Sequence, residues 1–204
     1  MLNILTKALP DAILINGVEL SILTDFRLWI SVGEVFRQSS GMEIIDVIDE
    51  LAELIVSREI PPDIHPEDFI SGVIDFYKGY PRMVGKSKRD AKPAKARKPD
   101  YDFLADSEFI YSSFVQVYGI RLTMVEMHWW EFLTLFDGLM FAEQNAISFV
   151  IGTRQADVKK ASKEERARLN RLKKDFELPK DESDAKAEAN LTDILMGGKK
   201  KDGR

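Results

Sequence analysis

Residues 101–141, YDFLADSEFIYSSFVQVYGIRLTMVEMHWWEFLTLFDGLMF, contain 11 of the 20 aromatic residues of the chain. We expect this aromatic-rich stretch to form the core of the protein. It predicts two helices, over 101–118 and 123–141, separated at Gly119, whose tolerance of positive φ suits the position just past a helix end. Thr123 and Glu126 have the spacing of a capping box, which predicts the start of the second helix.

The first predicted helix carries a single apolar stripe at the spacing of an amphipathic helix. Its expected core residues are Phe103, Ile110, Phe114 and Val117. Asp106 lies at the edge of this stripe, so we expect a buried carboxylate that bonds to Arg121, Arg27 or an indole N–H. Asp102 and Asp106 are also four residues apart, a spacing that can serve two-metal or acid–base chemistry, although acidic residues are favoured at a helix start by the macrodipole alone.

The second predicted helix is apolar on two sides. One side holds the expected core residues Trp129, Phe132 and Phe136, together with Val125 and Leu139. Met127, Trp130 and Phe141 project from roughly the opposite side. Such a helix is either sandwiched inside its own fold or offers a surface to a partner, and the sequence leaves both open.

The rest of the chain predicts a mainly α protein. An Asn16-Gly17 pair between alternating apolar residues predicts a small β-hairpin over 12–23. Thr24 and Asp25 offer cap oxygens to a helix that runs to about Phe36, with Trp29 inward and Arg27 beside that face, bonded to a carboxylate. Apolar periodicity predicts further helices over 42–58, from Pro66 to Gly79, over 142–158, and after the Ser162/Glu165 capping box.

Composition sets the boundaries of the predicted domain. We expect one compact helical domain of about six to seven helices over 1–179. Residues 85–100, GKSKRDAKPAKARKPD, hold seven Lys or Arg against two Asp and are expected to form a basic mobile loop. Residues 180–204 are expected to be a disordered tail, within which the apolar run 191–196 (Leu191 to Met196) is a candidate docking helix that needs a partner.

Composition also narrows the classes of function. The chain of 204 residues has no cysteine and a net charge of −5, and no apolar run approaches the roughly 18 residues of a membrane span. We therefore expect a protein of the cytoplasm, with no membrane partner. The basic loop has the cations to meet phosphates but no interleaved aromatic residue for base stacking, so specific nucleic-acid recognition is disfavoured.

The sequence gives no support for an enzyme. It has no phosphate-binding loop, no dinucleotide-binding glycine pattern and no hydrolase nucleophile motif. His128 with Glu131 supplies at most two metal ligands, so we expect His128 to be a buried pairing histidine. No catalytic, metal-binding or cofactor-binding residue is predicted.

Five segments together resemble a known family. They are DFRLWI at 25–30, DFYKGYP at 75–81, IYSSFVQVYGIRL at 110–122, MHWWEFLTLFDGL at 127–139 and FVIGTRQ at 149–155. In this combination the chain resembles the bacteriophage Gp15-type proteins, encoded next to the tape-measure gene in phages and prophages of Gram-positive bacteria. The family often carries an acidic residue after Ile120, where this chain has Arg121.

The resemblance implies a role in long-tail morphogenesis, in the cytoplasm of the host. Proteins at this genomic position look like tail assembly chaperones, which coat the tape-measure protein until tail-tube subunits displace them. On that basis we expect the tape-measure protein and other tail proteins as partners, self-association, and Met127, Trp130 and Phe141 as the partner-binding surface. Two rivals remain: a structural component retained in the virion, or an interaction module without a tail role.

Overall fold

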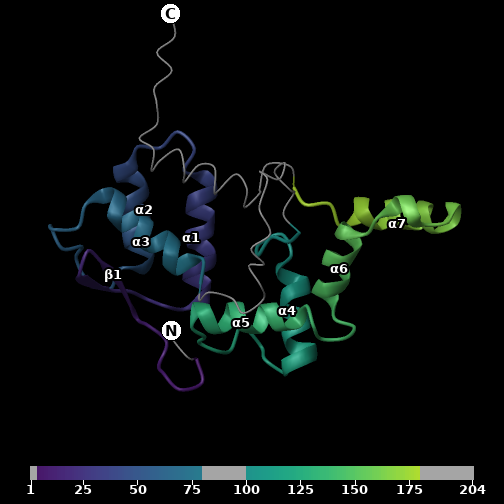
Figure 1. The fold of residues 1–204 in the computed structure, drawn as a ribbon, viewed down its shortest axis with the longest axis horizontal. Helices are drawn as coiled ribbons and strands as arrows, with labels where there is room; N and C mark the ends of the chain where they lie inside the picture. Colours follow the sequence, from purple (N-terminus) through teal and green to yellow (C-terminus); the bar gives the residue numbers. More distant parts are fainter. Residues whose placement is uncertain (1–3, 80–99, 180–204) are drawn as a thin grey trace, which may run out of the picture. The chain divides into compact units, whose positions relative to one another are not determined.

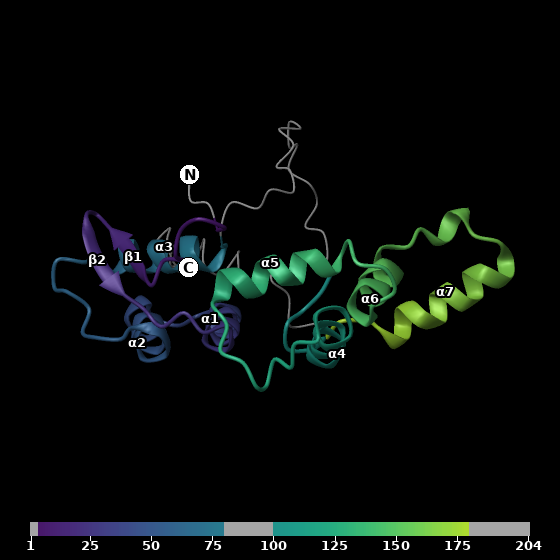
Figure 2. The same ribbon diagram turned by 90° about the horizontal axis from the view of Figure 1, so that it is seen from below.

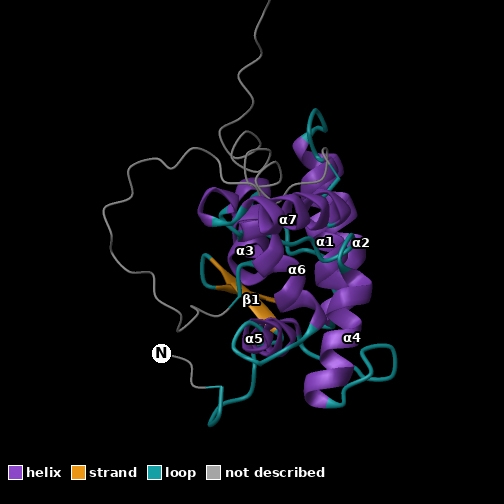
Figure 3. Ribbon diagram, turned by 90° about the vertical axis from the view of Figure 1, so that its right-hand side faces the viewer, coloured by secondary structure: helices purple, strands orange, loops and turns teal. Residues whose placement is uncertain are grey.

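The computed structural model describes residues 4–79 and 100–179 of the chain. Within them lie seven α-helices, one short 3₁₀ helix and one two-stranded antiparallel hairpin, which confirms the predicted mainly α fold with an N-terminal hairpin (Figures 1 and 3). The predicted basic loop, except Asp100, and the predicted tail with its apolar run 191–196 lie outside the described residues. None of the described helices is long and apolar enough to cross a membrane.

The described residues divide into two compact units. Unit 1 comprises 4–79 and 127–133, and unit 2 comprises 100–126 and 134–179. Helix α5 (Trp129–Leu139) therefore gives its first residues to unit 1 and the rest to unit 2. The assignment of 1–179 to a single domain stays a prediction.

The hairpin at the start of unit 1 forms where the turn signal predicts it. Strands β1 (Ala12–Ile15) and β2 (Val18–Ser21) pair with Ile15 opposite Val18, and both Asn16 and Gly17 have positive φ (Figure 2). The inward face of β1 packs on helix α3 (Pro66–Tyr77) at Gly72, where an added Cβ would lie 2.8 Å from Ile13 Cγ2. A side chain at Gly72 would therefore force the Ile13 and Ile15 side chains to shift.

Three helices complete the N-terminal part of unit 1. Helix α1 (Phe26–Gln38) begins after Asp25, whose carboxylate accepts the backbone N–H of Arg27, as predicted. Helix α2 (Ile44–Ile55) packs one apolar side against α1 and α3. The buried side chains of these helices include Trp29, Phe36, Leu51, Phe69 and Ile70.

Unit 2 is built on helices α4 (Ser107–Tyr118) and α6 (Ala146–Gln155), which pack against each other. The backbone N–H of Ile147 in α6 donates to the Ser113 hydroxyl of α4 at 3.0 Å. A 3₁₀ turn, Val158–Lys160, then leads to helix α7 (Lys163–Asp175), which Ser162 caps as predicted, and α7 lies beside α6 (Figure 2). Gly119 ends α4 with φ 68°, also as predicted.

Both helices of the aromatic stretch begin later than predicted. The predicted helix over 123–141 begins only at Trp129, because 127 and 128 are extended and pair with 24–26: Phe26 N–H donates to Met127 O, and Trp129 N–H to Thr24 O. The helix start predicted from the Thr123/Glu126 capping box is therefore wrong. The first helix begins at Ser107 because the Asp102 carboxylate binds the backbone N–H groups of Leu104 and Ala105, which favours a turn over a helix.

Candidate functional site

The adjacent residues Trp129 and Trp130 close the C-terminal end of α3. The indole N–H of Trp129 donates to Tyr77 O and that of Trp130 to Phe76 O, each at 2.9 Å. The last carbonyls of a helix have no partner within the helix, so the two indoles supply donors where they are needed. Trp130, predicted to bind a partner, is half-buried, and its ring lies 4.9 Å from that of Phe76.

His128 fixes the start of α5 with both ring nitrogens. Its Nδ1 accepts the backbone N–H of Trp130 at 3.0 Å, so the proton of the neutral ring is on Nε2, which lies 2.9 Å from Pro10 O and donates to it. Burial lowers the pKa of His128, and the bond to Pro10 opposes that effect. The histidine thus makes structural bonds at both nitrogens, but it is half-buried, not buried as predicted.

Met127 does not offer the exposed surface that the sequence predicts. Its side chain is only 7% exposed, because the residue lies in the extended segment that pairs with 24–26 rather than on a helix face. Phe141 differs from Met127: it follows the end of α5 and is 74% exposed.

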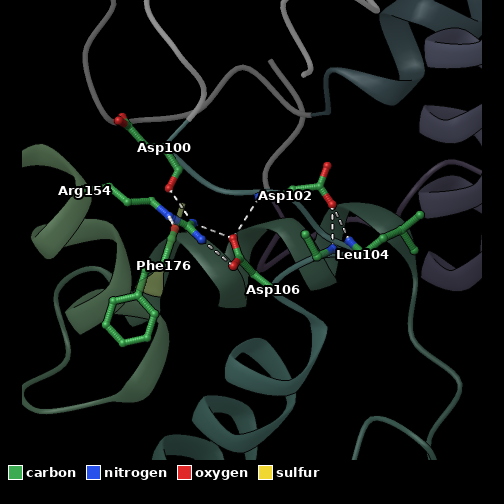
Figure 4. A network of polar contacts seen from close by, with 7 residues as sticks. Asp100, Asp102, Leu104, Asp106, Arg154 and Phe176 are labelled. Carbon is green, nitrogen blue, oxygen red and sulfur yellow. Dashed lines mark hydrogen bonds and ion pairs between the residues drawn. The ribbon is translucent and has the colours of Figure 1, made fainter. Parts of the chain in front are cut away.

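Asp106 and Arg154 form a buried ion pair in unit 2 (Figure 4). The two terminal guanidinium nitrogens of Arg154, Nη1 and Nη2, donate to the two carboxylate oxygens at 2.6 and 2.7 Å. Arg154 also donates to Asp100 O and, through Nε, to Phe176 O just past α7. Asp106 accepts the backbone N–H of Asp102 at 3.0 Å. One arginine therefore ties together the entry to α4, the end of α6 and the end of α7.

The partner predicted for Asp106 is therefore wrong. Arg121 is exposed, and Arg27 bonds instead to Asp25, two residues before it, with its guanidinium over the Phe26 ring. The Arg27 side chain is also 43% exposed, not buried as predicted, because the short reach to Asp25 keeps it at the start of α1. The Asp102 carboxylate serves the turn before α4.

The predicted core residues are placed as follows. The structure buries Trp29, Ile110, Phe114, Trp129, Phe132 and Phe136. Phe103 and Val117 are only half-buried. Phe103 precedes α4 instead of lying on it, and its ring meets that of Phe136 at 5.2 Å.

Asn145 is a site residue that sequence reasoning missed. Its buried amide donates to Leu139 O and Ala142 O at the end of α5, and its carbonyl oxygen caps α6 by accepting Ser148 N–H. The signal for it was present, since asparagine is a preferred N-cap residue. Arg154 was also missed, because a basic residue in the last turn of a helix is common and does not identify its partner.

Together these contacts define a mainly helical protein in which Arg27, Asp106 and His128 all make structural bonds. Within 4–79 and 100–179, no group of three or more His, Asp or Glu is placed to hold a metal ion. The family model described as Bacteriophage Gp15 protein matches residues 5–178. The chain therefore belongs to the bacteriophage Gp15 protein family. No curated protein and no solved structure matches it.

Proposed function

We propose that this protein is a non-catalytic chaperone of phage tail assembly. In this role it binds and solubilises the tape-measure protein in the cytoplasm of the host, until tail-tube subunits displace it. Membership of a bacteriophage family supports a role in the phage. The observation that carries the binding role is an exposed phenylalanine, Phe141, presented on a turn whose backbone is held in place.

The turn between α5 and α6 is held from several directions. Asn145 binds the carbonyls of Leu139 and Ala142, and the Gln116 side chain of α4 donates to Gln144 O at 2.8 Å. Because these bonds already exist in the free protein, a partner does not have to order the turn when it binds. Phe141 is therefore a preorganised apolar anchor.

The exposed side chains of this segment favour a partner with an apolar surface. Met140 and Phe149 are exposed on the same stretch of chain as Phe141. Burial of one such side chain contributes roughly 1.5–3 kcal/mol, which gives modest affinity for each copy. A long amphipathic helix that binds many copies gains avidity and still releases each copy to a competitor.

Co-expression with the tape-measure protein of the same phage tests the proposal. Wild-type protein should move the client into the soluble fraction and co-elute with it. Phe141→Ala should weaken both effects, whereas Leu14→Ala should not, since Leu14 on the hairpin is 73% exposed and matches Phe141 in exposure. If the client is equally insoluble with and without the protein, the chaperone role is wrong.

A second experiment separates a chaperone from a structural tail component. A chaperone is absent from finished particles, so mass spectrometry of purified phage should not detect this protein at the level of tail proteins. Stoichiometric retention in the particles would assign it to the virion.

A further inference from the structure

Helix α7 presents a basic row to solvent. Lys163, Arg171 and Lys174 lie on one side of the helix with Ala167 and Asn170 between them, opposite the apolar line of Leu169, Leu172 and Phe176. All five residues of the row are exposed, and none is acidic. Among the described residues, no hydrogen bond or ion pair engages the three cationic side chains of the row.

The ring contacts and side-chain hydrogen bonds that join α7 to the rest of unit 2 come from residues outside this row. The Phe176 ring meets those of Phe109 and Phe149, edge to face, at 5.7 and 6.0 Å. Arg154 donates to Phe176 O, and Lys173 Nζ donates back to Arg154 O at 3.0 Å. These bonds hold the helix by its apolar side and its C-terminal end, which leaves the basic row facing water.

Helix α2 in unit 1 presents the complementary charge. Asp46, Asp49, Glu50 and Glu53 follow the spacing i, i+3, i+4, i+7 and form one exposed row. The opposite side of α2 is buried through Val47, Ile48, Leu51 and Ile55. The helix contains no Lys or Arg, and no cation within the described residues pairs with these four carboxylates.

We propose that the basic row of α7 in one molecule docks on the acidic row of α2 in a second copy of this chain. At 1.5 Å per residue the acidic row is about 10 Å long and the basic row about 16 Å, so the shorter row fits within the longer. Like charges repel along each row in the isolated molecule, and pairing relieves both repulsions. The two surfaces differ, so the contact is head-to-tail and joins copies into a ring if the rotation between them closes, and into an open chain if it does not.

This self-association does not depend on the tape-measure role. Exposed ion pairs are individually weak and are screened by salt, so these assemblies should form at low ionic strength and high protein concentration and dissociate at high salt. Sedimentation velocity of the full-length wild-type protein, over a range of concentrations at 50 mM and 1 M NaCl, measures both dependences directly.

Charge reversal identifies the surfaces. The α7 variant Lys163→Glu/Arg171→Glu/Lys174→Glu and the α2 variant Asp46→Lys/Glu50→Lys/Glu53→Lys should each be monomeric at low salt. An equimolar mixture of the two should associate again, because each reversed row then meets a row of opposite charge. The control Lys7→Glu/Arg58→Glu/Arg121→Glu changes the net charge as much as the α7 variant, at exposed sites outside both rows, and should associate like wild type.

Three results would overturn the proposal. A wild-type protein that stays monomeric at every concentration at low salt excludes the contact between copies. Association that survives both reversals places the interface elsewhere. Loss of association without recovery in the mixture shows that the two rows do not bind each other.

Discussion

Arg154 and Asp106, 48 residues apart in the chain, form a two-pronged ion pair that is almost completely buried. Replacement of the arginine leaves a carboxylate in the interior without its cation. Arg154→Met should therefore lower the free energy of unfolding by about 3–5 kcal/mol. Urea unfolding followed by circular dichroism measures the loss.

Two further variants make this prediction specific. Arg168→Met removes an exposed arginine of α7 and should change the free energy of unfolding by less than about 0.5 kcal/mol. In the double variant Asp106→Asn/Arg154→Met no buried charge remains, so its cost should be smaller than the sum of the single costs. Additive costs would contradict the pairing.

The indole N–H groups of Trp129 and Trp130 should contribute different amounts to the stability of the protein. Trp129→Phe removes the donor to Tyr77 O in a fully buried site and should cost about 1–3 kcal/mol. Trp130→Phe should cost less, because Trp130 is only half-buried and Phe76 O keeps the backbone N–H of Gly79 at 3.0 Å. Thermal unfolding of both variants ranks them, and the reverse order would assign the larger structural role to Trp130.

His128 should make stability depend on pH. Burial lowers its pKa from the ordinary value of 6.5, so the folded protein binds fewer protons than the unfolded chain below that pH. The stabilisation from neutral His128 is therefore complete above pH 6.5 and is lost as the pH falls through the lowered pKa. Urea unfolding measures the free energy of unfolding at pH 7.5 and at pH 5.5. The decrease between the two pH values should be smaller in His128→Gln than in wild type. The variant His65→Gln, at the exposed residue before α3, should behave like wild type.

Two helical glycines in unit 2 should respond to alanine with opposite signs. A Cβ at Gly138 in α5 would lie 2.5 Å from the Tyr118 hydroxyl, which donates to Leu135 O, so Gly138→Ala should destabilise. Gly152 in α6 has nothing within 4 Å, and Gly152→Ala should stabilise by roughly 0.5–1 kcal/mol. Melting temperatures test both, and Tyr118→Phe should partly restore the Gly138→Ala variant.

Alanine variants of Phe114 and Phe141 should have different effects, the first on stability and the second on binding of the partner. Phe114 is fully buried in α4, so Phe114→Ala should cost about 3–5 kcal/mol of stability. Phe141→Ala should change stability by less than about 0.5 kcal/mol, because the side chain is exposed. A large loss of melting temperature in Phe141→Ala would place that ring in the interior.

The parts of this fold that the sequence predicts are those that depend on interactions between residues close together in the chain. The hairpin follows from Asn16-Gly17, the starts of α1 and α7 from the oxygens of Asp25 and Ser162, and the end of α4 from Gly119. In each case the signal and the group it satisfies lie within a few residues. Local propensity is then enough.

The features that sequence reasoning missed depend on distant partners. Thr123 and Glu126 have the spacing of a capping box, but backbone pairing of 127–128 with 24–26 moves the helix start to Trp129. Arg154 is an ordinary residue at a helix end until Asp106 is brought beside it. A pattern within one segment cannot identify a partner in another.

The tryptophan closure of α3 also bears on the order of synthesis. Unit 1 is discontinuous in the chain: the ribosome makes α1, α2 and α3 first, and 127–133 only after α4. Although domains tend to fold from the N-terminus during translation, the nascent unit 1 lacks both indole donors until Trp130 has left the ribosome. A nascent chain stalled before Met127 therefore carries an incomplete unit 1, exposed to chaperones and proteases of the host, so pausing within the segment 80–126 should lower the yield of folded protein.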